Sequence, residues 1–281
     1  MSGSAPAGRQ LSNLQLRVIS SIGLAAVVLA LTWYGGIAFR LLAALIALAI
    51  LYEWSQMSMR PGGGAIRVAA FAMLAIGMLA MVAGYSAEIV VIALVAAAAL
   101  VFAFGKATGQ GGETALSLAY AGASGLSLAF LRGADTNGLI AILFLFAVVW
   151  ATDILAYFVG RAVGGPKLAP AISPGKTWSG AIGGAAGGVL GGLAVALAAG
   201  LGNLPILALV ALLLSVVSQI GDLFESGVKR RHGAKDSGTV IPGHGGVMDR
   251  VDGLVAAAFA LYVIGAATGG LDNPIHALFT R

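Results

Sequence analysis

The chain has no cysteine, and its charged residues are few. Without cysteine there can be no disulfide bond, no thiolate metal site and no cysteine nucleophile. Asp, Glu, Lys and Arg make up 10% of the 281 residues, against about 25% in an ordinary soluble domain. This is too little charge for a surface that faces water on all sides. The composition therefore predicts that a lipid bilayer surrounds most of the protein.

Several motifs that would point to other chemistry are missing as well. There is no HExxH pair for zinc and no Ser, His and Asp set in a supporting context, so hydrolysis has no support. The segment 173–177 reads Ser-Pro-Gly-Lys-Thr but fails as a P-loop, because the first glycine of that motif would fall on Pro170. Nucleic-acid binding is not expected, since it would need a basic soluble face that this composition cannot supply.

Long apolar runs recur along the whole chain, and 59% of the residues are hydrophobic. A helix that crosses a bilayer needs about 20 mostly apolar residues. By this criterion the candidate spans are 16–34, 37–55, 66–84, 87–105, 115–131, 137–160, 177–200, 203–228 and 251–269. The predicted fold class is an all-α integral membrane protein, a polytopic bundle of about nine transmembrane helices, with eight or ten as near alternatives.

The basic residues fall unevenly on the two sides of such a bundle. Of the 16 Lys and Arg residues, only Arg40, Arg132 and Arg281 fall on the side opposite the N-terminus. The positive-inside rule then places the N-terminus in the cytoplasm, together with the loops 161–176 and 229–250. The predicted organisation is a mobile polar tail (1–12), N-terminal transmembrane helices (13–135) and a C-terminal transmembrane region (136–281).

The predicted span 177–200 is rich in glycine. Gly180, Gly184, Gly188 and Gly192 recur at four-residue spacing, which places them along one side of a helix. Small residues at this spacing let two helix backbones approach closely in lipid. We therefore expect a helix-packing surface here, and not a ligand site.

Acidic residues are concentrated in the second half of the chain, as Asp153, Asp222, Glu225, Asp236, Asp249 and Asp252. A charged side chain near the centre of a membrane helix costs about 2.5–3.5 kcal/mol on insertion scales. Each carboxylate therefore needs a partner, a cavity or a boundary position. Asp222 and Glu225 share one helix face, while Asp249 and Asp252 lie one turn apart where the last span begins. The same end of the bundle is expected to hold at least three carboxylates.

Two explanations fit this group of carboxylates. Lys229, Lys235 and Arg250 could neutralise them in ordinary salt bridges. Alternatively, a hard divalent ion such as Mg²⁺ could be held by one or two carboxylates and completed by water and substrate phosphates. Charge alone does not decide between the two.

The loops on the positive side offer two features that suit phosphate. Ser173 is expected to cap the N-terminus of a helix, with Pro174 in its first turn. Such a terminus attracts phosphate and Lys176 adds a positive charge, so a capping role and a substrate-binding role both stay open. His244 lies in the turn-forming run 242–246, whose glycines let the backbone approach a ligand closely.

From Ser226 onward the chain reads SGVKRRHGAKDSGTVIPGHGGVMDRVD, which resembles the signature of the phosphatidate cytidylyltransferase (CDP-diacylglycerol synthase) family. The matching positions are Ser226, Lys229, Arg230, Lys235, Asp236, Gly238, Pro242, His244, Gly245, Gly246, Asp249, Arg250 and Asp252. Upstream, Gly221-Asp222 and the stretch from Asp153 to Thr177 also resemble the family. The first 130 residues carry no resemblance at the level of single residues.

The resemblance implies transfer of CMP from CTP to phosphatidic acid, which yields CDP-diacylglycerol and pyrophosphate. It also implies a requirement for Mg²⁺, with a second metal ion as an open alternative, and a homodimer in the cell (inner) membrane. The active site would then face the cytoplasm, where CTP is available. The acyl chains of the lipid would stay in the bilayer between helices.

The resemblance also implies a role for each matching residue. Asp222 and Asp249 would be metal ligands. The catalytic residues would be Lys229, Lys235, Asp236, Arg250 and Asp252. The substrate-binding residues would be Asp153, Ser173, Lys176, Thr177, Ser226, Arg230, His244, Gly245 and Gly246.

Two other functions serve as alternatives. A cation-coupled transporter or channel would also contain carboxylates, but it should place several of them along the depth of the membrane. A CDP-alcohol phosphotransferase would need an Asp-Gly…Ala-Arg…Gly…Asp…Asp arrangement, which the sequence does not contain.

Overall fold

The computed structural model describes residues 13–58, 63–106, 109–240 and 245–279, with side chains from Ile22 onward. Two expectations lie outside these residues, namely the mobile tail 1–12 and the placement of His244. Within them the chain forms nine helices and one two-stranded antiparallel hairpin. The elements are α1 (Asn13–Tyr34), α2 (Gly36–Met57), α3 (Gly64–Ala83), α4 (Ala87–Lys106), α5 (Gly111–Arg132), α6 (Thr136–Val163), β1 (Lys167–Ala169), β2 (Ser173–Thr177), α7 (Trp178–Ala198), α8 (Leu204–Arg231) and α9 (Met248–Gly269).

Each predicted span corresponds to one helix, with ends that differ by a few residues. Eight helices, α2 to α9, are long and apolar enough to cross a membrane, and the described side chains of α1 cover a shorter apolar stretch, Ile22–Tyr34. Backbone N–H and C=O groups cannot stay unpaired in lipid, so apolar segments of this length form helices. The predicted polytopic membrane bundle is confirmed.

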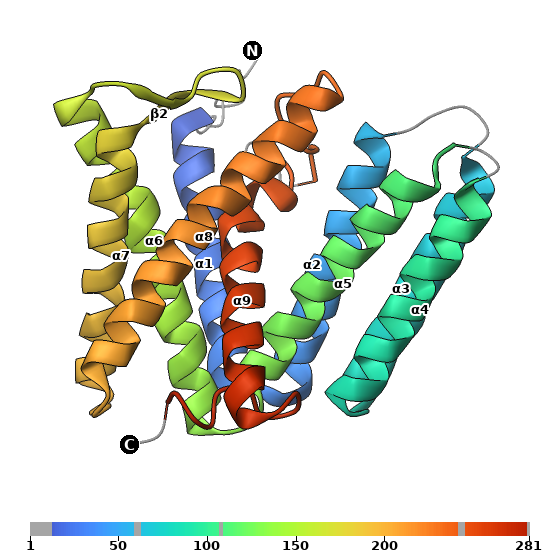
Figure 1. Ribbon diagram of the computed structural model, residues 1–281, viewed down its shortest axis with the longest axis horizontal. Helices are drawn as coiled ribbons and strands as arrows, with labels where there is room; N and C mark the ends of the chain where they lie inside the picture. Colours follow the sequence, from blue (N-terminus) through green and yellow to red (C-terminus); the bar gives the residue numbers. More distant parts are fainter. Residues whose placement is uncertain (1–12, 59–62, 107–108, 241–244, 280–281) are drawn as a thin grey trace, which may run out of the picture.

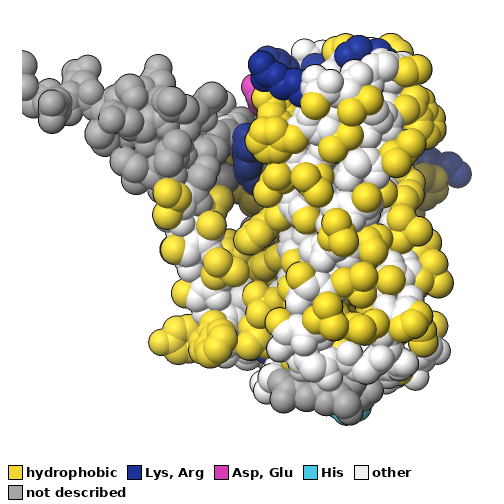
Figure 2. Space-filling view, turned by 90° about the vertical axis from the view of Figure 1, so that its left-hand side faces the viewer, with side chains coloured by type: hydrophobic (Ala, Val, Ile, Leu, Met, Phe, Trp, Pro, Cys, Tyr) yellow, Lys and Arg dark blue, Asp and Glu magenta, His cyan; other side chains and the backbone are white. Residues whose placement is uncertain are grey.

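The helices are arranged in pairs across the bundle (Figure 1). α3 and α4 lie together at one edge, α6 and α7 lie at the other, and α2 and α5 stand between them. α8 crosses the middle obliquely, and α9 stands upright beside it. The hairpin, the start of α1 and the loop after α8 share one end, which we call the hairpin end. Figure 2 shows hydrophobic side chains over most of one face and Lys and Arg gathered mainly toward that end.

The glycines of α7 pack against α6, as the spacing predicted. A Cβ atom added to Gly184 would lie 2.9 Å from the Thr152 carbonyl oxygen, and one added to Gly191 would lie 2.7 Å from the Ala147 carbonyl oxygen. Larger residues would therefore push the two backbones apart. Ile182 points away from this contact and is exposed, as expected for a side chain that faces lipid. Close packing of α7 fixes where the hairpin leaves α6 and where it returns.

The connection between α6 and α7 corrects one prediction. Ser173 does not cap a helix, because it begins strand β2. α7 starts later, at Trp178, and its N-cap is Thr177, whose hydroxyl oxygen accepts a hydrogen bond from Gly180 N at 3.1 Å. Pro174 suits an extended strand in a two-stranded hairpin as well as a first helical turn, because its fixed φ fits both and its missing N–H costs little at an edge.

Candidate active site

A cavity of about 680 Å³ opens at the hairpin end, between α6, the hairpin, α7 and α8. Its polar lining comes from three elements: Asp153, Tyr157 and Arg161 of α6; Lys167, Lys176 and Thr177 of the hairpin; and Gln219 and Asp222 of α8. Glycines form much of the remaining wall, so backbone is exposed to whatever enters. The cavity brings together four predicted site residues, Asp153, Lys176, Thr177 and Asp222.

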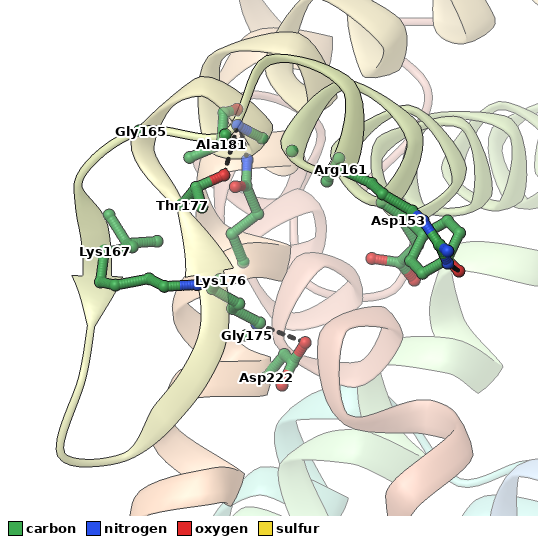
Figure 3. Close-up of a pocket in the computed structure, with 16 residues that line it drawn as sticks. Asp153, Arg161, Gly165, Lys167, Gly175, Lys176, Thr177, Ala181 and Asp222 are labelled. Carbon is green, nitrogen blue, oxygen red and sulfur yellow. Dashed lines mark hydrogen bonds and ion pairs between the residues drawn. The ribbon is translucent and has the colours of Figure 1, made fainter.

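Lys176 and Asp222 form an ion pair across this cavity (Figure 3). The Lys176 ammonium donates to Asp222 Oδ2, and Ser226 Oγ lies 3.4 Å from Asp222 Oδ1. The Lys176 and Asp222 side chains are 27% and 33% exposed. The pair is therefore open to an incoming ligand, and its partners can be exchanged.

Two further cationic side chains, which the sequence analysis did not assign to the site, line the cavity. Arg161 donates from Nη1 to the Tyr157 hydroxyl at 2.9 Å, and Lys167 extends inward from β1. Together with Lys176 they place three positive charges around one cavity, which suits a ligand with several phosphates. Both belong to the segment 161–176 that was predicted as a loop on the positive side, and this location is the sequence signal for them.

A group of carboxyl side chains lies where α6, α8 and α9 converge. Asp252 interacts electrostatically with Asp153, Asp222 and Glu225. Glu225 is fully buried, its Oε1 has no hydrogen-bond donor within the described residues, and the Asp252 carboxyl group is within hydrogen-bonding reach of it. Carboxyl oxygens this close need a proton or a cation between them.

Asp249 has a different environment. Its Oδ1 accepts a hydrogen bond from Lys229 Nζ at 2.6 Å, and its Oδ2 accepts from the backbone N–H groups of Ser237 and Gly246, both at 2.9 Å. Lys229 also contacts Glu225 Oε2 at 3.0 Å. The salt bridge and the two N–H groups thus account for both oxygens of Asp249, whereas Lys229 reaches only one oxygen of Glu225. The role of Asp249 as a metal ligand stays a prediction.

The remaining predicted residues take peripheral positions. Lys235, Asp236 and Arg250 are exposed and do not line the cavity. Arg230 donates to the carbonyl oxygens of Ile172 and Ala234, at 3.4 and 3.1 Å, and so connects the end of α8 to the hairpin. The predicted substrate-binding and catalytic roles of these residues stay predictions.

Gly245 and Gly246, by contrast, lie close to the acidic groups. Gly245 has φ +81°, and a Cβ atom there would lie 2.9 Å from Asp249 Oδ2. Gly246 is buried against Glu53 of α2. Both glycines therefore allow the loop to approach carboxylates more closely than a residue with a side chain would.

Glu53 is the acidic residue that sequence reasoning missed. It belongs to the N-terminal half, where the resemblance gave no residue-level guide, yet it is 1% exposed and reaches the loop before α9. A single carboxylate in an otherwise apolar span is itself a reason to look for a role.

The donor set fits a hard divalent cation in its chemistry. The group Asp153, Asp222, Glu225 and Asp252 offers only carboxylate oxygens, the ligand type that Mg²⁺ prefers, and one of those oxygens is buried without a donor. Within the described parts of the chain, no three such side chains already surround a common point. A cation bound here would therefore take water and substrate oxygens as its other ligands.

Comparisons with known proteins identify the family of this chain. The chain matches the cytidylyltransferase family over residues 15–267. It is 51% identical to a phosphatidate cytidylyltransferase of Brucella suis biovar 1 (strain 1330) over 273 residues, which is 96% of this chain and 100% of the relative. It is 34% identical to a phosphatidate cytidylyltransferase of Staphylococcus epidermidis (strain ATCC 12228) over 249 residues, or 85% of this chain and 94% of the relative. The match includes the N-terminal helices, so the chain belongs along nearly its whole length to the cytidylyltransferase family.

Proposed function

We infer that the protein transfers CMP from CTP to phosphatidate and releases CDP-diacylglycerol and pyrophosphate. The observation that carries this function is the cavity at the hairpin end, where three cations face a carboxylate group in a bundle of apolar helices. Such a cavity offers cations for the phosphates of a nucleoside triphosphate and carboxylates for the metal ion that accompanies it. The family assignment also argues against the two alternative functions, a transporter and a CDP-alcohol phosphotransferase.

The reaction needs neutralisation of charge more than proton transfer. A phosphate oxygen of phosphatidate attacks the α-phosphorus of CTP, and the bond from that phosphorus to the pyrophosphate oxygen breaks. A phosphomonoester has a second pKa of about 6, so the attacking oxygen is already ionised at neutral pH. The barrier comes from bringing one anion to another and from charge that builds on the leaving pyrophosphate.

The residues of the cavity suit this task. Arg161, Lys167 and Lys176 would bind the triphosphate and stabilise the leaving pyrophosphate. Asp222, with Asp153 and Asp252 beside it, would hold Mg²⁺, which when bound supplies further positive charge at the phosphates. The ammonium of Lys176 then has phosphate oxygens as partners in place of Asp222.

We propose that the protein lies in the cell (inner) membrane and that its hairpin end faces the cytoplasm. The excess of Lys and Arg on that side supports this orientation, and it would give the cavity direct access to CTP. We further propose a homodimer on the strength of the family resemblance. Light scattering of the protein in lipid nanodiscs, with the lipid mass subtracted, would give one protomer or two.

The function is tested with purified protein, labelled CTP and phosphatidate in mixed micelles. We expect labelled CDP-diacylglycerol when Mg²⁺ is present, and none when either substrate or the metal is omitted. Diacylglycerol in place of phosphatidate is the matched control, because it lacks the attacking phosphate. Absence of product from well-folded protein with several acyl species would contradict the proposal.

A further inference from the structure

Glu53 joins α2 to the start of α9. Its Oε1 accepts a hydrogen bond from Val247 N at 2.7 Å, and its Oε2 accepts from Met248 N at 2.8 Å and from Ser237 Oγ at 2.9 Å. The first N–H groups of a helix have no partner within the helix, and they favour a negative charge. Val247, the residue before α9, supplies no side-chain cap. A carboxylate from a different helix therefore caps α9.

Asp249 of α9 holds two described residues of the connection between α8 and α9, Ser237 and Gly246. Ser237 bonds to Glu53 through its hydroxyl and to Asp249 through its backbone N–H, so one residue connects the two carboxylates. Gly246 N donates to Asp249 while its α-carbon lies against Glu53, where a Cβ atom would overlap both Glu53 and Ser237 Oγ. Ser237 and Gly246 are thus held between the Glu53 and Asp249 carboxylates.

The network continues into the candidate active site. Asp249 accepts from Lys229, and Lys229 in turn contacts Glu225, the buried acid beside Asp252. A change at Glu53 can therefore reach Lys229 through only two intervening residues. Within the described residues, the partners of Glu53 are N–H and O–H groups, so its role is to hold backbone in place.

We propose that Glu53 is a positioning residue, which fixes the loop around Ser237 and Gly246 and so sets the placement of Asp249 and Lys229. This assigns a definite task to the N-terminal half of the chain. In its kinetic consequence the proposal rests on the proposed function, but its structural consequence can be measured without any substrate.

The kinetic test uses Glu53→Gln, which keeps the size of the side chain but puts an amide N–H₂ where an acceptor is needed. We expect kcat to fall on the order of 10–100-fold, the usual range when a residue that orients a ligand or a catalytic group is lost. The KM for CTP should stay nearly unchanged, because the cations of the cavity lie on other elements. An effect on KM alone would overturn the proposal.

The chain offers a matched control at the opposite end of the bundle. Asp272 Oδ1 accepts a hydrogen bond from Ala87 N at 2.6 Å and so caps the start of α4 in the same way. That start of α4 lies at the end of the bundle opposite the hairpin (Figure 1). Asp272→Asn should lower thermal stability without changing kcat per folded protein. If Glu53→Gln likewise loses activity only in proportion to the folded fraction, Glu53 is merely structural and the positioning role is wrong.

Hydrogen–deuterium exchange gives the readout that is independent of activity. In Glu53→Gln, the amides of Ser237, Gly246, Val247 and Met248 should exchange faster than in the parent protein, whereas Asp272→Asn should leave them unchanged. Unaltered exchange at these amides would overturn the proposal. If the parent protein made no CDP-diacylglycerol, the proposed function would fail while the exchange result still decided the role of Glu53.

Discussion

At the scale of single residues, the acids of the hairpin end differ in what neutralises them. Asp249 is satisfied by one ammonium and two backbone N–H groups, whereas Asp222 faces a single half-buried lysine at the wall of the cavity. Glu225 and Asp252 face each other. Of the two predicted metal ligands, Asp222 is thus the one that can exchange its partner for an ion without dismantling a loop.

Replacing Asp222 with Asn should therefore reduce activity strongly. We expect kcat to fall on the order of 100-fold, comparable to the loss of one group that stabilises charge in a transition state, and the Mg²⁺ concentration for half-maximal rate to rise. Rates measured across a magnesium titration would check this. The control is Glu88→Gln, which changes an exposed acid in α4. If Asp222→Asn behaved like this control, Asp222 would not be a metal ligand.

The cations that line the cavity predict a different kinetic signature. Arg161→Ala should raise the KM for CTP about 10- to 100-fold, because a hydrogen bond to a charged group contributes about 1.5–3 kcal/mol and about 1.4 kcal/mol corresponds to a factor of ten. Lys106→Ala removes an exposed charge from the end of α4 and should leave KM unchanged. Initial rates over a range of CTP concentrations distinguish the two. Equal KM values for both variants would show that Arg161 does not bind the nucleotide.

At the scale of elements, the contact between α6 and α7 carries the hairpin. Gly187 packs where an added Cβ atom would lie 2.9 Å from Leu155 Cβ and 3.0 Å from the Ala151 carbonyl oxygen. Lipid gives helices no hydrophobic drive to associate, so close packing is what holds this pair together. The position of Lys167 and Lys176 depends on it.

Gly187→Ala should therefore destabilise the protein even though alanine favours helices. Overpacking of a tight contact costs about 1–3 kcal/mol, so the melting temperature should fall. Gly23 of α1 has nothing within 4 Å of an added Cβ atom, and Gly23→Ala should keep or raise the melting temperature. Thermal unfolding in detergent gives both values. A similar result for the two variants would contradict tight packing at Gly187.

Elements were easier to predict than their connections. The spans follow from apolar length alone, since lipid allows an isolated apolar segment little other than a helix. The hairpin is held by pairing between strands of three and five residues, too short to show a period in the sequence. Glu53 meets partners more than 180 positions away, and no local pattern reports such a contact. The acids of α8 and α9 were predictable because they stand at helical spacing.

At the scale of the whole molecule, the orientation in the membrane is open to a direct test. Because the chain has no cysteine, single cysteines can be labelled selectively. In intact cells, Lys235→Cys should react with an impermeant maleimide only after the membrane is opened, while Asn273→Cys at the other end should react at once. Labelling of position 235 from outside intact cells would invert the proposed topology.

The length of α6 and α8 bears on how the enzyme meets its lipid. Each has 28 residues, or about 42 Å of helix, against about 30 Å of hydrocarbon. Asp153 and Asp222 lie about 15 and about 14 Å inside the hairpin-side ends of these helices. If the extra helix length projects at the hairpin end, we expect both carboxyl groups just below the lipid headgroups. Phosphatidate can then arrive by moving sideways in its own leaflet.

The concentration that this enzyme senses is then the fraction of membrane lipid that is phosphatidate. Diluting micelles or vesicles in buffer that holds CTP and Mg²⁺ constant should leave the rate per protein unchanged, whereas adding inert phospholipid at constant total phosphatidate should lower it. Turnover measured along both series would check this. A rate set by the bulk concentration of phosphatidate would mean that the lipid is taken up from water. The supply of substrate would then not depend on the fraction of phosphatidate in the bilayer.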